Sequence, residues 1–354
     1  MSRLGVVLPV LTLVLSGGVA CATASEAPDT SLPVTTERRL DTVGPIDTVV
    51  AISIDGLNPR AIIKLGPRRA PALNELIRTG ATTLNARTEL ELTDTLPNHT
   101  GMVTGRRIDA ATGGHGVTWN DERRRPRTVQ AAAGLDVSSV FNVVHDAGGR
   151  TALFASKVKF SLWERSWPDA IDTDVIVEDN KALAARFVTD LTNQTRSFRF
   201  LHLSAPDVAG HARGFMGPAY LRAVAATDRL VAKVMGTISS APNLTGHTAV
   251  ILTADHGGRG RSHREPSSRV NYTVPFMVWG PDVATGADLY AINPTYANPQ
   301  RERSNYEDAP IRNGDVANVA LDLLELPAVP DSEHDAAQDL DWVALTARQT
   351  AATG

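Results

Sequence analysis

Short apolar runs alternate along the chain with longer stretches in which apolar residues recur every three or four positions. The runs are rich in β-branched residues, and they predict buried strands at residues 47–54, 151–155, 198–203, 249–252 and 274–279. The periodic stretches predict helices at residues 72–79, 137–147, 180–192, 218–238 and 316–324. Strands that alternate with amphipathic helices are typical of a parallel sheet covered on both faces. The predicted fold class is therefore α/β, a three-layer α/β/α sandwich with a mostly parallel central sheet.

The N-terminal segment does not share this pattern. Arg3 precedes an apolar run at residues 4–15, which is too short to span a membrane and is typical of a secretory signal peptide. Residues 22–24, Ala-Thr-Ala, favour cleavage after Ala24. The position of Cys21, the only cysteine of the chain, favours a lipid anchor instead. Both alternatives predict an exported protein, periplasmic, extracellular or attached to the cell surface, and both leave a mature domain without a disulfide.

Amino-acid composition indicates the class of protein and its domain organisation. The chain has 354 residues, of which 42% are hydrophobic and 21% charged, as in ordinary soluble globular proteins. Residues 25–45 are rich in Thr, Ser, Pro and Asp, which predicts a linker, and we expect one large domain at 46–345 with a tail at 346–354. Lys and Arg number 35 against 39 for Asp and Glu, so the net charge of −4 gives no reason to expect a nucleic-acid surface.

Acidic residues and histidines follow three of the predicted strands. Asp55 follows the first strand, Asp207 and His211 follow the strand at 198–203, and Asp255 and His256 follow the strand at 249–252. The ends of strands facing the crevice of an open α/β sheet are where such folds place their ligands. Because zinc and similar divalent metals take mixed oxygen and nitrogen ligands, these side chains predict a metal site.

Six ordered motifs resemble those of the alkaline phosphatase superfamily, and most closely its type I phosphodiesterase/nucleotide pyrophosphatase branch, as a compact bacterial-type member. They are IDG at residues 54–56, TLPNH at 95–99 with VTG at 103–105, GHGV at 114–117, PDVAGH at 206–211, TADHGG at 253–258 and PFMVWGP at 275–281. The resemblance implies the same α/β sandwich, and it implies that the domain at 46–345 is catalytic.

The resemblance also implies two divalent metals, usually zinc, with manganese as an alternative. Asp55, Thr95, Asp255 and His256 would surround one metal, and Asp207, His211 and a third histidine would hold the other. We expect that third histidine to be His263, with His334 as the alternative. Thr95 stands at the position of the nucleophile, and Asn98 matches the donor to a phosphate oxygen.

The expected reaction is hydrolysis of a small-molecule phosphate ester through a phospho-threonine intermediate. A bound cation lowers the pKa of a coordinated hydroxyl, and two metals stabilise both ends of an in-line displacement. A phosphodiesterase or nucleotide pyrophosphatase is the leading hypothesis, for which Trp119, Phe160 and Trp163 are candidates for an apolar slot. A phosphomonoesterase or phosphonate hydrolase is the alternative, for which Lys157 and Lys159 are candidates to bind extra negative charge. A non-catalytic metal-binding lipoprotein is a third hypothesis.

Overall fold

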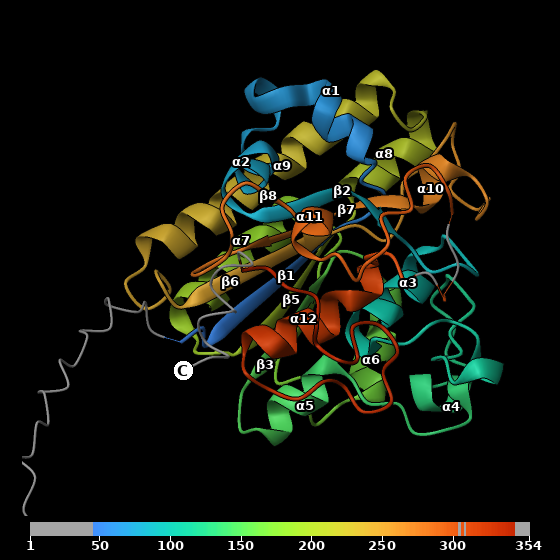
Figure 1. Cartoon of the computed structure of the whole chain (residues 1–354). Helices are drawn as coiled ribbons and strands as arrows, with labels where there is room; N and C mark the ends of the chain where they lie inside the picture. The colour runs from blue at the N-terminus through green and yellow to red at the C-terminus, as the bar shows by residue number, and fades with distance from the viewer. Residues whose placement is uncertain (1–44, 304–305, 308, 344–354) are drawn as a thin grey trace, which may run out of the picture. The chain divides into compact units, whose positions relative to one another are not determined.

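The computed structural model describes residues 45–303, 306–307 and 309–343. Eight strands form one sheet in the order β4-β3-β5-β1-β6-β7-β2-β8 (Figure 1). All neighbouring pairs are parallel except those of β7, which runs antiparallel to both β6 and β2. The strands are β1 (Thr48–Ile54), β2 (Ala81–Arg87), β3 (Thr151–Ala155), β4 (Asp174–Ile176), β5 (Phe198–Leu203), β6 (Thr248–Thr253), β7 (Thr273–Trp279) and β8 (Ala287–Asp288).

The central strands are buried along their whole length. Every residue of β1, β3, β5 and β6 is buried, including both faces of each strand. A strand covered on both faces has no solvent side, which explains why these segments are continuous apolar runs and not alternating patterns. The predicted mostly parallel α/β sandwich is thus confirmed.

Helices cover both faces of the sheet (Figure 1). One layer contains α1 (Pro59–Arg69), α2 (Pro71–Thr79), α7 (Asn180–Asn193), α8 (Ala205–Arg213) and α9 (Pro218–Ser240). The other contains α3 (Thr95–Thr104), α5 (Val140–Asp146) and α12 (Val316–Leu323), with α4 (Val129–Ala133) and α6 (Ser161–Ser166) beside them. Two short helices, α10 (Arg269–Tyr272) and α11 (Leu289–Ile292), complete the described part of the chain, together with short 3-10 turns.

Several predicted elements differ from the structure. No helix was predicted at residues 93–100, but α3 begins there at Thr95, after the extended residue Asp94. Gly105 ends α3 in the left-handed conformation with φ 62°, where glycine carries no steric penalty. The sequence pattern also gave no helix for α1 and no strand for β2. The predicted signal peptide, its cleavage and lipidation alternatives, and the linker up to residue 44 lie outside the described residues.

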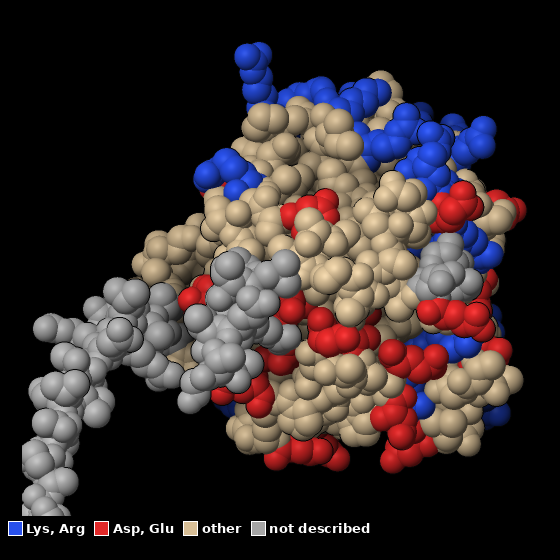
Figure 2. Space-filling view, in the orientation of Figure 1, with Lys and Arg blue, Asp and Glu red and all other residues tan. Residues whose placement is uncertain are grey.

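Surface charge is unevenly distributed despite the small net charge. On the face shown in Figure 2, Lys and Arg side chains gather over α1 and near α10, whereas most Asp and Glu side chains lie on the other half of that face. The exposed residues of α1 include Arg60, Lys64, Arg68 and Arg69. Within the residues that the structure describes, no helix has both the length and the apolar character needed to cross a membrane.

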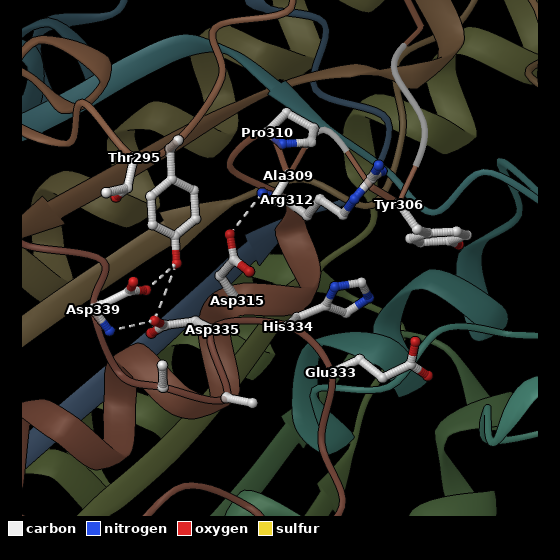
Figure 3. A pocket seen from close by; sticks show the side chains of 13 residues that line it. Thr295, Tyr306, Ala309, Pro310, Arg312, Asp315, Glu333, His334, Asp335 and Asp339 are labelled. Carbon is white, nitrogen blue, oxygen red and sulfur yellow. Dashed lines mark hydrogen bonds between the residues drawn. The ribbon is translucent and has the colours of Figure 1, made fainter.

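The C-terminal segment encloses a pocket of about 350 Å³ (Figure 3). Acidic side chains line it: Asp315, Glu333, Asp335 and Asp339. The Tyr296 hydroxyl lies 3.1 Å from both Asp335 Oδ1 and Asp339 Oδ1. Burial and the nearby Asp315 raise the pKa of Asp335 to about 8. Of these four residues, Asp315 and Asp335 are buried, whereas Glu333 and Asp339 are exposed.

Candidate active site

Four neighbouring parallel strands bring the predicted site residues together. In the order β3-β5-β1-β6 the strands run in the same direction, so their C-terminal ends lie along one edge of the sheet. Asp55 follows β1 and Asp255 follows β6, while β5 leads through Ser204 into α8, which carries Asp207 in its first turn. The topology thus explains why residues about 200 positions apart in sequence face one another.

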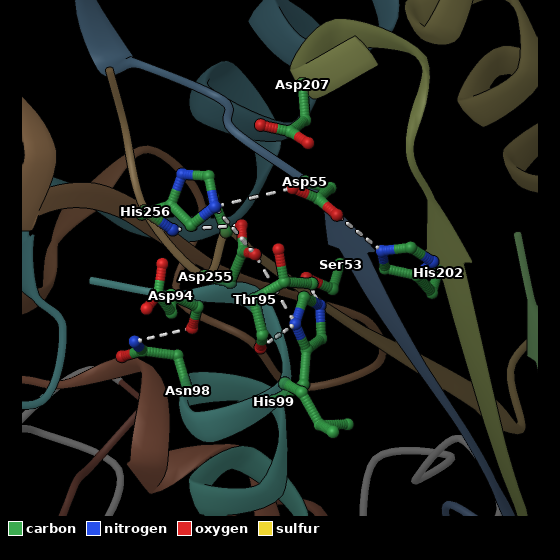
Figure 4. A network of polar contacts seen from close by, with 12 residues as sticks. Ser53, Asp55, Asp94, Thr95, Asn98, His99, His202, Asp207, Asp255 and His256 are labelled. Carbon is green, nitrogen blue, oxygen red and sulfur yellow. Dashed lines mark hydrogen bonds and ion pairs between the residues drawn. The ribbon is translucent and has the colours of Figure 1, made fainter. Parts of the chain in front are cut away.

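The first half-site consists of Asp55, Asp255 and His256 (Figure 4). His256 Nε2 lies 3.5 Å from Asp55 Oδ1 and 3.2 Å from Asp255 Oδ2. All three side chains are fully buried. Gly56 makes this packing possible, because it adopts φ +71° and a Cβ there would lie 3.2 Å from the Cα of Asp207. Its N–H donates to Asp255 Oδ1 at 3.0 Å and so orients that carboxylate.

The second half-site consists of Asp207, His211 and His263. Asp207 and His211 lie one turn apart on α8, with 3.3 Å between Asp207 Oδ1 and His211 Nε2. His263, in the loop after β6, places its Nε2 3.1 Å from His211 Nε2 and 3.9 Å from Asp207 Oδ1. The His256 ring stacks on the His263 ring with 3.6 Å between centroids, so the two half-sites adjoin.

Backbone carbonyls orient the three histidines in the same way. His256 Nδ1 lies 2.8 Å from the carbonyl oxygen of Gly257, and His263 Nδ1 lies 2.6 Å from that of Thr93. His211 Nδ1 lies 2.9 Å from the carbonyl oxygen of Arg261. A carbonyl can only accept, so each Nδ1 is a protonated nitrogen, and in the neutral ring Nε2 is then the atom whose lone pair can bind a metal. Metal-binding histidines are commonly held in one tautomer by this kind of bond.

Four buried atoms without hydrogen-bond partners are atoms that would bind metal. Among the described residues, Asp55 Oδ1, Asp207 Oδ1, Asp255 Oδ2 and His256 Nε2 are buried and accept no hydrogen bond. An unpaired buried carboxylate oxygen is costly, and native proteins rarely tolerate several together. The ligand atoms of Asp55, Asp255 and His256, and those of Asp207, His256 and His263, lie within 4.8 Å of one another. These residues fit divalent metals.

The protonation states also suit metal binding. Burial lowers the pKa of His256, and burial together with His256 lowers the pKa of His263 to about 3, so both imidazoles are neutral. Burial and Asp55 act to raise the pKa of Asp207, but the adjacent His211 imidazole and the charge of Lys157 outweigh them and lower that pKa to about 2. Burial and Asp55 hold the pKa of Asp255 well above its usual range, which reflects repulsion that a cation would relieve.

Thr95 lies beside this centre at the first position of α3 (Figure 4). It is buried, and its carbonyl oxygen lies 2.8 Å from His99 Nδ1, while His99 Nε2 contacts Ser53 Oγ at 2.8 Å. His99 therefore connects the start of α3 to the end of β1. His202, a buried residue of β5, contacts Asp55 Oδ2 at 2.9 Å and so positions a predicted ligand.

Asn98 lies close to Thr95 but its amide is already engaged. Its Nδ2 donates to the carbonyl oxygens of Leu92 and Asp94 at 2.8 and 3.0 Å, and its Oδ1 accepts from the Glu89 N–H at 2.9 Å. The side chain thus ties the approaching loop to α3. Its hydrogen bonds give Asn98 a structural role and leave neither amide hydrogen for a phosphate oxygen.

Asn120 is a site residue that the sequence reasoning missed. Its Oδ1 accepts from the Leu96 N–H at 3.0 Å, next to Thr95, and from Lys159 Nζ at 2.8 Å. With Oδ1 fixed by two donors, the amide nitrogen is the end of the side chain that can bind an anion. Its position six residues after Gly114, just beyond the GHGV motif, was the available signal.

His334, the alternative third histidine, lies elsewhere. It lines the C-terminal pocket of Figure 3, where its Nε2 pairs with Glu89 Oε1 at 2.9 Å. Phe160 and Trp163, two candidates for an apolar substrate slot, are fully buried and belong to the core, where their rings pack edge to face with 4.9 Å between centroids. The candidate lysines are closer to the centre: Lys157 Nζ lies 2.6 Å from Asp55 Oδ2.

Comparisons with known proteins agree with this geometry. Residues 49–340 match the family described as type I phosphodiesterase/nucleotide pyrophosphatase. The chain is 26% identical over 201 residues to ectonucleotide pyrophosphatase/phosphodiesterase family member 1 of Mus musculus, a match that covers 53% of this chain and 21% of that protein.

Solved structures show the same fold. Murine ectonucleotide pyrophosphatase/phosphodiesterase 5, an inactive variant in complex with AMP, superposes with a TM-score of 0.62 at 12% identity, covering 83% of this chain and 99% of that one. A 2-O GAG sulfatase superposes with a TM-score of 0.58 at 13% identity, covering 81% of this chain and 72% of that one.

Proposed function

Because the chain belongs to the type I phosphodiesterase/nucleotide pyrophosphatase family, we propose that it is a two-metal hydrolase of small phosphate esters, with Thr95 as the nucleophile. The observation that carries the proposal is the set of buried, partnerless ligand atoms beside this threonine. Structural centres satisfy their polar atoms internally, whereas an open set of this kind matches a catalytic metal site.

Each half-site has a separate task in this proposal. Asp55, Asp255 and His256 would hold one metal next to Thr95, and Asp207, His211 and His263 would hold the second. When bound, the two divalent cations, with zinc favoured by the ligands and manganese as an alternative, would lower the pKa of the threonine hydroxyl and neutralise charge on the phosphoryl group.

Side chains of the protein orient the reacting groups in this proposal. His99 holds the backbone of Thr95, so the hydroxyl starts from a fixed position at the N-terminus of α3. Thr95 Oγ1 attacks phosphorus, an alcohol or phosphate leaves, and a phospho-threonine ester forms; water then cleaves that ester and restores the hydroxyl. Asn120 Nδ2 would stabilise a phosphoryl oxygen where charge develops. We propose Asn120 for the task predicted for Asn98.

The family and the AMP complex of a structural neighbour favour a diester or nucleotide pyrophosphate substrate. The two lysines beside the centre favour the second candidate, a phosphomonoesterase or phosphonate hydrolase on the same site. A non-catalytic lipoprotein is disfavoured, because Thr95 and both half-sites are complete. We further propose that the enzyme acts outside the cytoplasm, from the signal-peptide pattern, with lipid attachment at Cys21 as one of the two alternatives.

The test is an assay of the purified protein with bis-p-nitrophenyl phosphate and p-nitrophenyl phosphate. We expect turnover that a chelator abolishes and that zinc or manganese restores. Thr95→Ala should lower kcat by at least about 10³-fold without loss of bound metal, because the nucleophile is removed and the carboxylate and histidine ligands remain. Activity that persists in Thr95→Ala, or that resists the chelator, would refute the mechanism.

A further inference from the structure

Exposed basic side chains gather in three segments that contain almost no acidic residues. Residues 56–74, 208–217 and 256–272 contain Glu265 as their single acidic residue, although the whole chain has a net charge of −4. Figure 2 shows Lys and Arg side chains over α1 and near α10, which belong to these segments. The exposed Lys and Arg residues of the three segments, called the basic strip, are Arg60, Lys64, Arg68, Arg69, Arg213, Arg259, Arg261, Arg264 and Arg269.

Hydrogen bonds between the segments make the basic strip continuous. The N–H of Phe215, just after α8, donates to the carbonyl oxygen of Gly260 at 2.7 Å. Asn58 Nδ2, at the start of α1, donates to the carbonyl oxygen of Val270 in α10 at 3.5 Å. The strip therefore runs from the end of α8 across the loop after β6 to α10 and α1.

The positive charge of the basic strip is not neutralised by salt bridges. Within the part of the chain that the structure describes, the salt bridges of Lys and Arg side chains involve Arg78, Arg106, Arg107, Arg123, Arg150, Lys157, Arg196 and Arg199. None of these residues belongs to the strip. A contiguous surface of uncompensated positive charge attracts polyanions, even on a protein whose net charge is negative.

A pocket of about 370 Å³ lies within this surface and is lined by residues of both α1 and α10. Arg60, Arg269 and Arg301 line it together with Ile63 and Leu84, and none of its lining residues is acidic. Guanidinium groups match the geometry of a phosphate group and bind it through two parallel hydrogen bonds. This pocket, called the arginine pocket, therefore offers phosphate donors and aliphatic surface side by side.

We propose that the basic strip is a docking surface for an anionic phospholipid bilayer, and that the arginine pocket receives the phosphate group of one lipid. Basic side chains are attracted to the negative surface of such a bilayer. Ile63 is 67% exposed, the highest value among the exposed large hydrophobic side chains of the described residues. An aliphatic side chain in this position can enter the headgroup layer while the Lys and Arg side chains around it keep their charges in water.

A single-stranded nucleic acid is the other polyanion that a basic strip could attract. Proteins that bind single strands stack the bases on exposed aromatic side chains. The large hydrophobic side chains that the described residues expose are all aliphatic: Ile63, Leu135, Val158 and Val208. The combination of basic and aliphatic groups therefore favours a bilayer.

The basic strip borders the second half-site. Arg213 lies two residues after His211 at the end of α8, and His211 Nδ1 donates to the carbonyl oxygen of Arg261. The His211 side chain is 45% exposed, so the half-site opens toward this surface. A docked bilayer would lie beside that opening. Docking itself requires no hydrolysis, so it can be measured whether or not the proposed function holds.

The first measurement is sedimentation of the purified full-length chain with lipid vesicles. Vesicles of phosphatidylcholine alone are compared with vesicles of equal parts phosphatidylcholine and phosphatidylglycerol. We expect much tighter binding to the anionic vesicles, and we expect added salt to weaken it. The ratio of the two affinities is the readout, because any binding through the apolar run at residues 4–15 would contribute to both.

The double variant Arg60→Gln/Arg269→Gln removes two charges from the arginine pocket. Each basic residue near an anionic bilayer strengthens binding by roughly fivefold, so affinity for the anionic vesicles should fall roughly 20-fold. The matched control, Lys181→Gln/Arg186→Gln, removes two exposed charges from α7 and should keep nearly the wild-type affinity. Ile63→Gln should weaken binding severalfold even at high salt, because it removes an apolar contact only. All five side chains are exposed, so the melting temperatures should stay close to that of the wild type.

A free phosphate ester and a nucleic acid are the alternative ligands to test. Glycerol 3-phosphate, measured by calorimetry, and a single-stranded DNA, measured by fluorescence anisotropy, should both bind the wild type more weakly than the anionic vesicles do. Equal affinity for the two kinds of vesicle, or equal losses in the pocket variant and in the α7 control, would overturn the inference. Tighter binding of the DNA, or binding of glycerol 3-phosphate to the arginine pocket without binding of vesicles, would overturn it as well.

Discussion

The Nε2 atoms of His211 and His263, 52 residues apart in sequence, lie 3.1 Å from each other. Each ring donates its Nδ1 proton to a backbone carbonyl, so two lone pairs face one another across this short distance. Two nitrogen lone pairs attract only if a proton or a cation lies between them. With Asp207 Oδ1 at 3.3 Å from His211 Nε2, a shared metal is the arrangement that satisfies all three atoms.

His263→Ala should therefore remove one of the two metals. The loss of one ligand from a three-ligand set weakens binding by orders of magnitude, and the first half-site keeps its own carboxylates. Metal analysis of the purified variant should give about one equivalent where the wild type gives about two. Activity should fall with the metal content and recover partly at high zinc concentration.

His334→Ala is the matched control for this experiment. His334 pairs with Glu89, far from the metal-facing atoms, so the variant should keep both metals. Its free energy of unfolding should drop by about 1–3 kcal/mol, because the buried Glu89 carboxylate loses its paired imidazole and keeps the Tyr306 hydroxyl as a donor. Loss of metal in His334→Ala but not in His263→Ala would contradict the assignment of the second half-site.

Most of this fold could be predicted from the sequence alone, because strands buried on both faces appear as continuous apolar runs. The runs that became β3 and β5 were predicted to the residue. Elements with weaker patterns were missed: α3 is buried on all sides, so it has no amphipathic period, and β2 is only partly apolar. The antiparallel direction of β7 has no signature in a single sequence.

The site was predictable where residues able to bind metal come soon after a predicted strand. Asp55, Asp207 and Asp255 were found in this way, and Lys157 follows β3 by the same rule. Its contact with Asp55 was not predictable, because that contact depends on β3 and β1 lying on either side of β5. Asn98 and Asn120 could be separated only by their hydrogen bonds, which depend on the tertiary structure.

The two asparagines should respond differently to substitution. Asn120→Ala should lower kcat by about 10²- to 10³-fold, because its free amide nitrogen is the proposed donor to a phosphoryl oxygen. It also leaves the Leu96 N–H without its side-chain acceptor, so some loss of stability should accompany the loss of rate. Asn98→Ala should instead lower the free energy of unfolding by about 1–3 kcal/mol, since it leaves the Glu89 N–H without its side-chain acceptor. Steady-state kinetics and chemical denaturation of both variants measure the contrast, and similar kcat values for the two would contradict it.

The three crowded carboxylates should make the metal-free protein unstable. Asp255 Oδ2 has no hydrogen-bond partner in the described structure, and Asp55 lies next to it. Chelation should lower the melting temperature of the wild type, because the repulsion between these buried charges is no longer compensated. In Asp255→Asn the metal-free protein should melt higher than the metal-free wild type, yet gain less on addition of zinc. Calorimetric melting curves with and without zinc test both parts, and an equal gain from zinc in both proteins would contradict the argument.

Asp335 in the C-terminal pocket should make stability depend on pH independently of the metals. Its pKa is raised to about 8 by burial and by Asp315, against an unfolded value near 4, so the folded protein holds a proton that the unfolded chain releases. Stability from this group is present below about pH 4 and is lost progressively as the pH rises to about 8.

Asp335→Asn removes the ionisable group and keeps an oxygen that can accept from the Asp339 and Leu340 N–H groups. The variant should exceed the wild type in free energy of unfolding by about 1–3 kcal/mol at pH 8, with little difference at pH 4. Urea unfolding at both pH values measures this, and a difference that does not change with pH would show that Asp335 ionises normally in the folded protein.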